Sequence, residues 1–111
     1  MKQEELQAIA AQLKHPTGEK GIEMANMMHE TNINMTHHSI QNLNVSKENK
    51  ILELGHGNAG HLEFLMDQAE SLVYYGLEMS ELMFQEARQI NRNYVSHILA
   101  LFLLYDGGVI P

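Results

Sequence analysis

The fold of this chain is decided by one stretch, Ile51-Leu52-Glu53-Leu54-Gly55-His56-Gly57-Asn58-Ala59-Gly60. Its apolar part, over Lys50 to Leu54, predicts a buried strand, and the glycine-rich part that follows predicts a tight turn. The next segment places four apolar residues on one helical face: Leu62, Leu65, Met66 and Ala69. A second apolar run, from Ser71 to Leu77, predicts another strand. This order of strand, turn, helix and strand predicts a β-α-β unit with parallel strands.

The same alternation continues toward the end of the chain. Ser80 is expected to cap a helix, with Glu81 in its first turn. The apolar face of this helix is formed by Leu82, Met83, Ala87 and Ile90. Leu99 to Leu104 predicts a third strand, and Asp106-Gly107-Gly108 predicts a turn after it. The predicted fold class is therefore α/β, an incomplete Rossmann-like, three-layer domain with a three-stranded parallel sheet and N-terminal helices.

The first 45 residues have apolar residues at helical spacing. A first helix is predicted over residues 3–13, a second after Thr17, and a third from about Thr31 to Leu43. The segment Lys14 to Gly18 contains Pro16, which cannot continue a helix and is expected to end the first one. We therefore expect an N-terminal helical segment at residues 1–45 and an α/β segment at residues 46–111.

Composition excludes several classes of protein. With 111 residues the chain forms at most one domain, and its formal net charge of -7 argues against non-specific binding of nucleic acid. The absence of cysteine excludes disulfides and thiolate metal sites. The seven histidines fall at no recognisable ligand spacing, so no metal is expected. No apolar run is long enough to span a membrane, and the start of the chain is too polar for a signal peptide, so a cytoplasmic protein is expected.

The glycine turn and two acids predict a nucleoside-binding site. Glycines let the backbone approach a ligand, and Glu78, at the end of the second strand, can accept hydrogen bonds from both ribose hydroxyls. Because Gly55, Gly57 and Gly60 fit the dinucleotide fingerprint literally, an NAD- or FAD-binding domain is one alternative. Glu53 argues against it, since a carboxylate beside a pyrophosphate is unfavourable. It favours a ligand with a cationic amino acid end.

These residues resemble the class I S-adenosylmethionine-dependent methyltransferases, whose first motif is an acid, an apolar residue and Gly-x-Gly-x-Gly. Glu53, Gly55 and Gly57 match that motif, while Ala59 stands where the third glycine is usual. The resemblance implies that S-adenosylmethionine is the cofactor and that Glu53 acts near its methionine amino group. It also implies that Glu78 binds the ribose.

Two further segments extend the resemblance. Residues 103–111 resemble the third-strand motif, in which Asp106 would contact the adenine amino group. Met79, which follows the ribose acid, can lie against adenine or pack in the core. Residues 12–18 resemble the helical lead-in of the small-molecule methyltransferases related to the ubiquinone and menaquinone C-methylating enzymes. The resemblance therefore implies transfer of a methyl group to a small molecule, while it identifies no catalytic residue.

Members of this family continue beyond the third strand. The resemblance therefore implies that residues 46–111 are the N-terminal half of a cofactor-binding methyltransferase domain, truncated after the third strand. The first strand would then be a free edge, which predicts self-association through that edge of the sheet. A second alternative stays open, in which the half-domain is catalytically inactive and serves as an interaction module.

Overall fold

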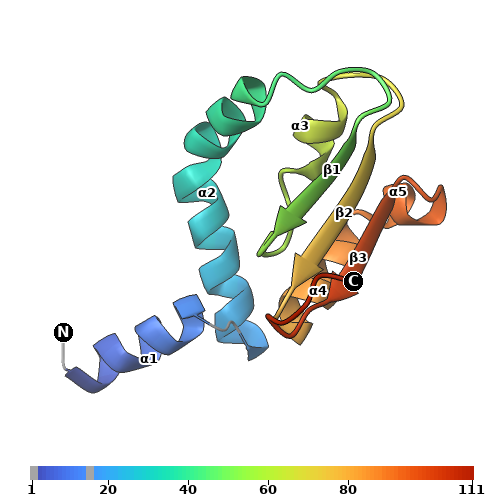
Figure 1. Cartoon of the computed structure of the whole chain (residues 1–111). Helices are drawn as coiled ribbons and strands as arrows, with labels where there is room; N and C mark the ends of the chain where they lie inside the picture. Colours follow the sequence, from blue (N-terminus) through green and yellow to red (C-terminus); the bar gives the residue numbers. More distant parts are fainter. Residues whose placement is uncertain (1–2, 15–16) are drawn as a thin grey trace.

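The computed structural model describes residues 3–14 and 17–111 of the chain. The elements, in chain order, are α1 (Gln3–Lys14), α2 (Gly18–Asn42), β1 (Lys50–Leu54), α3 (Leu62–Met66), β2 (Val73–Glu78), α4 (Glu81–Ile90), α5 (Arg92–Ser96) and β3 (Ala100–Leu104). The strands form one parallel sheet in the order β1-β2-β3 (Figure 1). The predicted α/β class and three-stranded parallel sheet are confirmed.

Strand register determines which side chains face the helices, because successive residues of a strand point to opposite faces. Two rows across the sheet share the helix-covered face: Ile51, Tyr74 and Ala100, followed by Glu53, Gly76 and Phe102. Together with Ile40, Ala59, Leu62, Leu65 and Ala87, the buried members of these rows form the hydrophobic core. Tyr74, which is fully buried, lies in the middle strand of this core.

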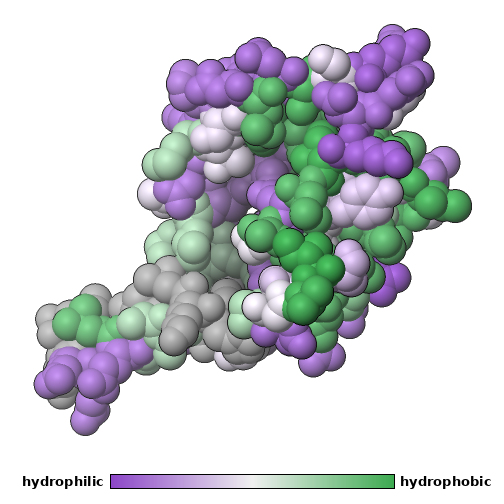
Figure 2. Space-filling view, in the orientation of Figure 1, coloured by the Kyte–Doolittle hydropathy of each residue, from purple (hydrophilic) through white to green (hydrophobic). Residues whose placement is uncertain are grey.

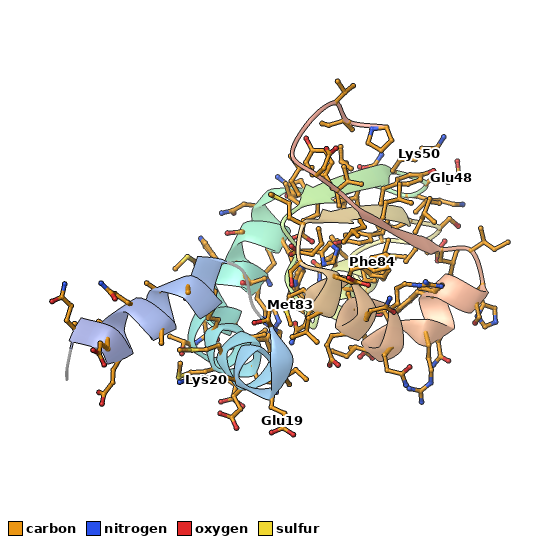
Figure 3. The ribbon with its side chains drawn as sticks, turned by 90° about the horizontal axis from the view of Figure 1, so that it is seen from below. Glu19, Lys20, Glu48, Lys50, Met83 and Phe84 are labelled. Carbon is orange, nitrogen blue, oxygen red and sulfur yellow. The ribbon has the colours of Figure 1, made fainter. Side chains whose placement is uncertain are left out.

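The helices that contact the strands lie on one face of the sheet. Helix α4 contacts β2 and β3, α5 contacts β3, and Figure 1 shows both behind the sheet together with α3. The view from below shows α4, which carries Met83 and Phe84, on that same side (Figure 3). Of the three layers expected, the described residues therefore build two, the sheet and one layer of helices.

The opposite face of the sheet is apolar and largely open, although Leu77 on this face is buried. Leu52, Leu54 and Leu101 point to this face and are 52%, 54% and 49% exposed. Figure 2 shows a band of hydrophobic residues running along the strands on the side that faces the viewer. Parallel sheets are normally covered on both faces, so this surface is unusual for a parallel sheet.

The N-terminal part differs from the prediction, because one 25-residue helix, α2, replaces the two helices expected after Thr17. Its asparagines disfavour helix interiors, but tertiary packing overrides that preference. Ile40 is buried in the core, and the His37 ring stacks on Phe64 with centroids 3.8 Å apart. His15 and Pro16, which were expected to end the first helix, lie outside the described residues.

Other boundaries follow local chemistry. Ser80 caps α4 as predicted, since its hydroxyl oxygen accepts a hydrogen bond from the Met83 N–H at 3.3 Å. Helix α3 is shorter than its apolar spacing indicated, because it ends at Met66 and does not reach Ala69. Helix α5 was not predicted. No helix among residues 3–14 and 17–111 is both long and apolar enough to cross a membrane.

Candidate functional site

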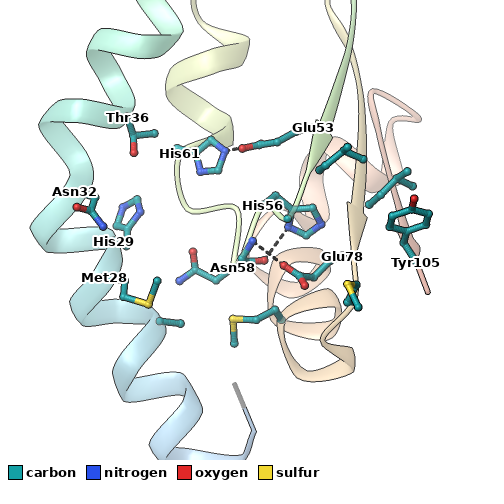
Figure 4. A pocket seen from close by; sticks show the side chains of 17 residues that line it. Met28, His29, Asn32, Thr36, Glu53, His56, Asn58, His61, Glu78 and Tyr105 are labelled. Carbon is teal, nitrogen blue, oxygen red and sulfur yellow. Dashed lines mark hydrogen bonds and ion pairs between the residues drawn. The ribbon is translucent and has the colours of Figure 1, made fainter. Parts of the chain in front are cut away.

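A half-open pocket of about 860 Å³ lies between α2 and the carboxyl ends of β1 and β2 (Figure 4). The carboxyl ends of parallel strands are where ligands bind in open α/β sheets. One wall is formed by the strand ends and the turn between β1 and α3. The other wall is a face of α2 that carries Ala25, Met28, His29, Asn32 and Thr36.

Five of the six predicted site residues line this pocket: Glu53, Gly55, Gly57, Glu78 and Met79. Asp106 does not line it. The Asp106 side chain is exposed and accepts a hydrogen bond from the Gly108 N–H at 2.8 Å, the turn chemistry of an Asp-Gly-Gly sequence. The turn itself borders the Met79 end of the pocket, because a Cβ at Gly107 would lie 3.7 Å from the Met79 Cε.

The turn after β1 has left-handed backbone at three positions. Gly55, Gly57 and Ala59 have φ angles of 67°, 62° and 52°. At Ala59, in the place of the usual third glycine, this conformation costs about 1–2 kcal/mol relative to glycine. A Cβ at Gly55 or Gly57 would meet nothing within 4 Å, so backbone conformation and not crowding favours glycine there. The space next to both glycines is therefore open to a ligand.

Glu78 joins this turn to the start of α4. Its Oε1 accepts a hydrogen bond from the Gly57 N–H and its Oε2 accepts one from the Ser80 N–H, each at 2.9 Å. A carboxylate oxygen has two lone-pair directions, so each oxygen of Glu78 can accept a further hydrogen bond from a ligand hydroxyl. The backbone contacts thus hold the carboxylate in place at the wall of the pocket.

Glu53 has two partners that the sequence did not predict. Its Oε1 accepts hydrogen bonds from His61 Nε2 and from the Tyr74 hydroxyl, both at 2.6 Å. Burial by itself would raise the pKa of Glu53, but the hydrogen bonds from His61 and Tyr74 and the charge of His61 outweigh it and lower the pKa. Burial raises the pKa of Tyr74, which therefore stays a neutral donor. The Glu53 Oε2 has no hydrogen-bond partner among the described residues.

The side chain of His56 lies inside the turn. It is 5% exposed, packs edge-on against Phe102 with ring centroids 5.0 Å apart, and donates from Nδ1 to the Gly57 carbonyl at 2.7 Å. Burial lowers its pKa, which favours the neutral ring. Its Nε2 is buried without a hydrogen-bond partner among the described residues.

Sequence reasoning missed His61, Tyr74 and the whole α2 wall. Glu53 and Tyr74 share the helix-covered face of the sheet, but recognising this requires the register of β1 against β2. The side chains of His29, Asn32 and Thr36 depend on how α2 packs, for which the local sequence gave no signal. No group of three or more histidines and acids within the described part of the chain is arranged to hold a metal ion.

The polar groups of the pocket can be compared with those that S-adenosylmethionine would need. A nucleoside with a cationic amino acid end needs an acceptor for the ribose hydroxyls, an open backbone turn, and a carboxylate with a free oxygen. Glu78, the Gly55–Gly57 turn and the Oε2 of Glu53 supply these three features. Among the described residues, the lining contains no lysine or arginine, which a pyrophosphate would favour.

No family model and no curated protein matches the chain. Among solved structures, a chain of the complex between the Haloferax volcanii Trm112 methyltransferase activator and a candidate methyltransferase is similar, with 24% identity and a TM-score of 0.64. That match covers 78% of this chain and 37% of the other. The S-adenosylmethionine-dependent methyltransferase of Geobacter sulfurreducens, in complex with S-adenosyl-L-homocysteine, has 19% identity and a TM-score of 0.51, with 62% and 27% covered.

A third similar structure is the S-adenosylmethionine-dependent methyltransferase of Thiobacillus denitrificans, also in complex with S-adenosyl-L-homocysteine. It has 16% identity and a TM-score of 0.50, and the match covers 68% of this chain and 29% of the other. This chain thus spans between 27% and 37% of the length of these three structures. At these identities the likeness shows the fold alone. The described residues have a partial Rossmann-like α/β fold, which is similar to part of the fold of these methyltransferases.

Proposed function

We propose that this chain binds S-adenosylmethionine as part of a methyltransferase that acts on a small molecule. The observation that carries the proposal is the pair of carboxylates on either side of the open glycine turn. Glu78 accepts a hydrogen bond from the Gly57 N–H of the turn. Glu53, on the same wall of the pocket, has one carboxylate oxygen without a hydrogen-bond partner among the described residues. This pattern suits a ligand with a ribose at one end and a cationic amino acid at the other.

In this proposal each predicted residue has a role. Glu78 binds the ribose hydroxyls, and Glu53 acts near the methionine amino group through a water molecule or backbone. Gly55 and Gly57 let the backbone approach the ligand, and the exposed Met79 side chain lies against adenine. Asp106 would contact the adenine amino group from the turn beside Met79. The bound cofactor supplies an electrophilic methyl group on a sulfonium, and in-line transfer depends mainly on positioning.

Titration calorimetry with S-adenosylmethionine and, separately, with NAD tests this proposal against the dinucleotide alternative. We expect heat of binding with S-adenosylmethionine and none with NAD, because the described lining residues include no lysine or arginine to compensate a pyrophosphate. Binding of NAD alone would reverse the assignment. Binding of neither ligand would favour the second alternative, an interaction module without methyltransferase activity.

We also propose that the chain self-associates through the free edge of β1. The strand order makes β1 an edge strand, and its Leu52 and Leu54 lie on the open apolar face. A strand edge offers unpaired N–H and C=O groups, and pairing of two β1 strands across a two-fold axis would satisfy them. Sedimentation velocity at micromolar concentration is expected to show a dimer or larger species. A compact monomer would contradict the proposal.

A further inference from the structure

We propose that the Glu53–His61 pair and the polar wall of α2 form the acceptor subsite, in which Nδ1 of His61 takes the proton of the methyl acceptor. The inference rests on the proposed function. It assigns the acceptor to a chemical class, a neutral small molecule whose nucleophilic atom carries a hydrogen, such as a phenol. His61, His29, Asn32 and Thr36 were not among the predicted site residues.

The geometry of the pair leaves one nitrogen of His61 available. Nε2 lies 2.6 Å from the Glu53 carboxylate, and this charge favours the tautomer in which Nε2 carries the hydrogen. Nδ1 then has a free lone pair, and it has no hydrogen-bond partner among the described residues. Although the His61 side chain is only 10% exposed, the residue lines the pocket. A carboxylate–imidazole pair of this kind can both orient a base and stabilise its protonated form.

The α2 wall provides polar groups opposite this pair. Figure 4 shows His29, Asn32 and Thr36 on the α2 side of the pocket, with His61 between Thr36 and Glu53. Among the described residues, none of these three side chains has a hydrogen-bond partner within the protein, so their polar atoms are available to a ligand. Gly60 allows this packing, because a Cβ there would lie 3.0 Å from the His29 Cε1.

The negative charge of the pocket limits which methyl acceptors it can bind. The pocket lining holds the carboxylates of Glu53 and Glu78 and, within the described part of the chain, no lysine or arginine. An anionic acceptor, such as a carboxylate or a phosphate, would be repelled by these groups. Met28 from α2, Leu54 from β1 and Met83 from α4 add apolar surface to the pocket, which suits a small neutral ring with a hydroxyl group.

The transfer step balances without a further reactant. The acceptor oxygen donates an electron pair to the methyl carbon, and the new C–O bond forms while the C–S bond breaks. The C–S electron pair stays on sulfur and yields a neutral thioether. The acceptor proton moves to Nδ1 of His61, and the resulting imidazolium is stabilised by the Glu53 carboxylate. The positive charge thus passes from the sulfonium to the histidine.

The first test determines which nitrogen of His61 carries the hydrogen, under conditions in which no methyl transfer takes place. Long-range ¹⁵N–¹H NMR reports which imidazole nitrogen carries the hydrogen. At pH 8 we expect His61 to have hydrogen on Nε2 and a bare Nδ1, and we expect catechol, added with S-adenosyl-L-homocysteine, to perturb the signals of His61 and His29. A His61 with hydrogen on Nδ1, or no catechol-dependent change at these residues, would overturn the inference.

The second test uses His61→Gln, which keeps an N–H donor toward Glu53 and removes the basic nitrogen, with His38→Gln on the exposed side of α2 as its matched control. Binding of S-adenosylmethionine is expected to be equal in both variants and the wild type. With catechol as the acceptor, His61→Gln is expected to lose about 100-fold or more in kcat, as removal of a general base does. Equal kcat in both variants would overturn the inference. Failure of the wild type to bind S-adenosylmethionine would instead count against the proposed function.

Discussion

At the scale of single residues, the pocket depends on carboxylates that are held by the protein itself. Glu53 accepts two hydrogen bonds at 2.6 Å through one oxygen, and Glu78 accepts one backbone N–H on each oxygen. Hydrogen bonds to an ionised group are stronger than neutral ones and fix its position. Both acids were predicted from the sequence, because Glu53 lies two residues before the first glycine of the turn and Glu78 lies at the end of the second strand. The His61 and Tyr74 partners were not predicted, because they depend on packing 8 and 21 residues away.

The lowered pKa of Glu53 predicts a specific dependence of stability on pH. A carboxyl group whose pKa is lower in the folded than in the unfolded state stabilises the fold above its unfolded pKa, near 4.5. That contribution is lost as the pH falls through the folded pKa. We therefore expect Glu53→Gln to be less stable than the wild type at pH 7, with the difference shrinking below pH 4.5. Chemical denaturation at pH 7 and at a pH below 4.5, with the exposed Glu70→Gln as control, measures this difference in the free energy of unfolding. A difference that does not change with pH would contradict this account.

At the scale of elements, the strands were predicted to within two residues at each end. Apolar runs of five or six residues between polar turns locate strands well, as Lys50–Leu54 illustrates. The length of α2 was mispredicted because its asparagine-rich middle weakens the local signal, while Ile40 and the stack of His37 on Phe64 hold the helix against the core. The α2 wall of the pocket could not be predicted for the same reason, since long-range packing places it.

Close packing between β2 and the turn predicts that Gly76→Ala is destabilising. A Cβ at this position would lie 2.7 Å from the His56 Cδ2, 2.9 Å from the Tyr74 Cε1 and 3.0 Å from the Phe102 Cδ1. Buried rings cannot move freely, so we expect a loss of about 1–3 kcal/mol in the free energy of unfolding.

The matched substitution is Gly60→Ala, whose Cβ would meet the side chain of His29 on α2 at 3.0 Å. His29 is half-buried at the pocket and can rotate away, so a smaller loss is expected. Urea denaturation of the two variants decides the comparison. A Gly76→Ala protein as stable as the wild type would mean that the packing around His56 is looser than described.

At the scale of the whole molecule, the sheet is covered on one face only. All strand-contacting helices lie behind the sheet in Figure 1, and the face with Leu52 and Leu101 is open. Half-exposed leucines on a parallel sheet form a surface that another protein surface would cover. The sequence predicted the free β1 edge through the family resemblance, but it did not predict that much of one face is uncovered.

This surface predicts how charge would change association. Leu52→Lys places a charge on the β1 edge strand and on the open face, which opposes both strand pairing and apolar contact. We expect this variant to sediment as a smaller species than the wild type at the same concentration, with little change in stability, because Leu52 is already 52% exposed. The control is Leu6→Lys on α1, which is 53% exposed and lies away from the sheet (Figure 1). Unchanged sedimentation of Leu52→Lys would argue against association through β1.

The most direct test of the central claim is titration calorimetry of S-adenosyl-L-homocysteine with the wild type, Glu78→Ala and the exposed control Glu70→Ala. If Glu78 binds the ribose, its removal is expected to weaken binding by about 1.5–3 kcal/mol, the value of hydrogen bonds to a charged group. Glu70→Ala is expected to bind as the wild type does, and thermal unfolding of each variant verifies that it is folded. Equal affinity of a folded Glu78→Ala protein and the wild type would contradict the assignment of this pocket to the cofactor.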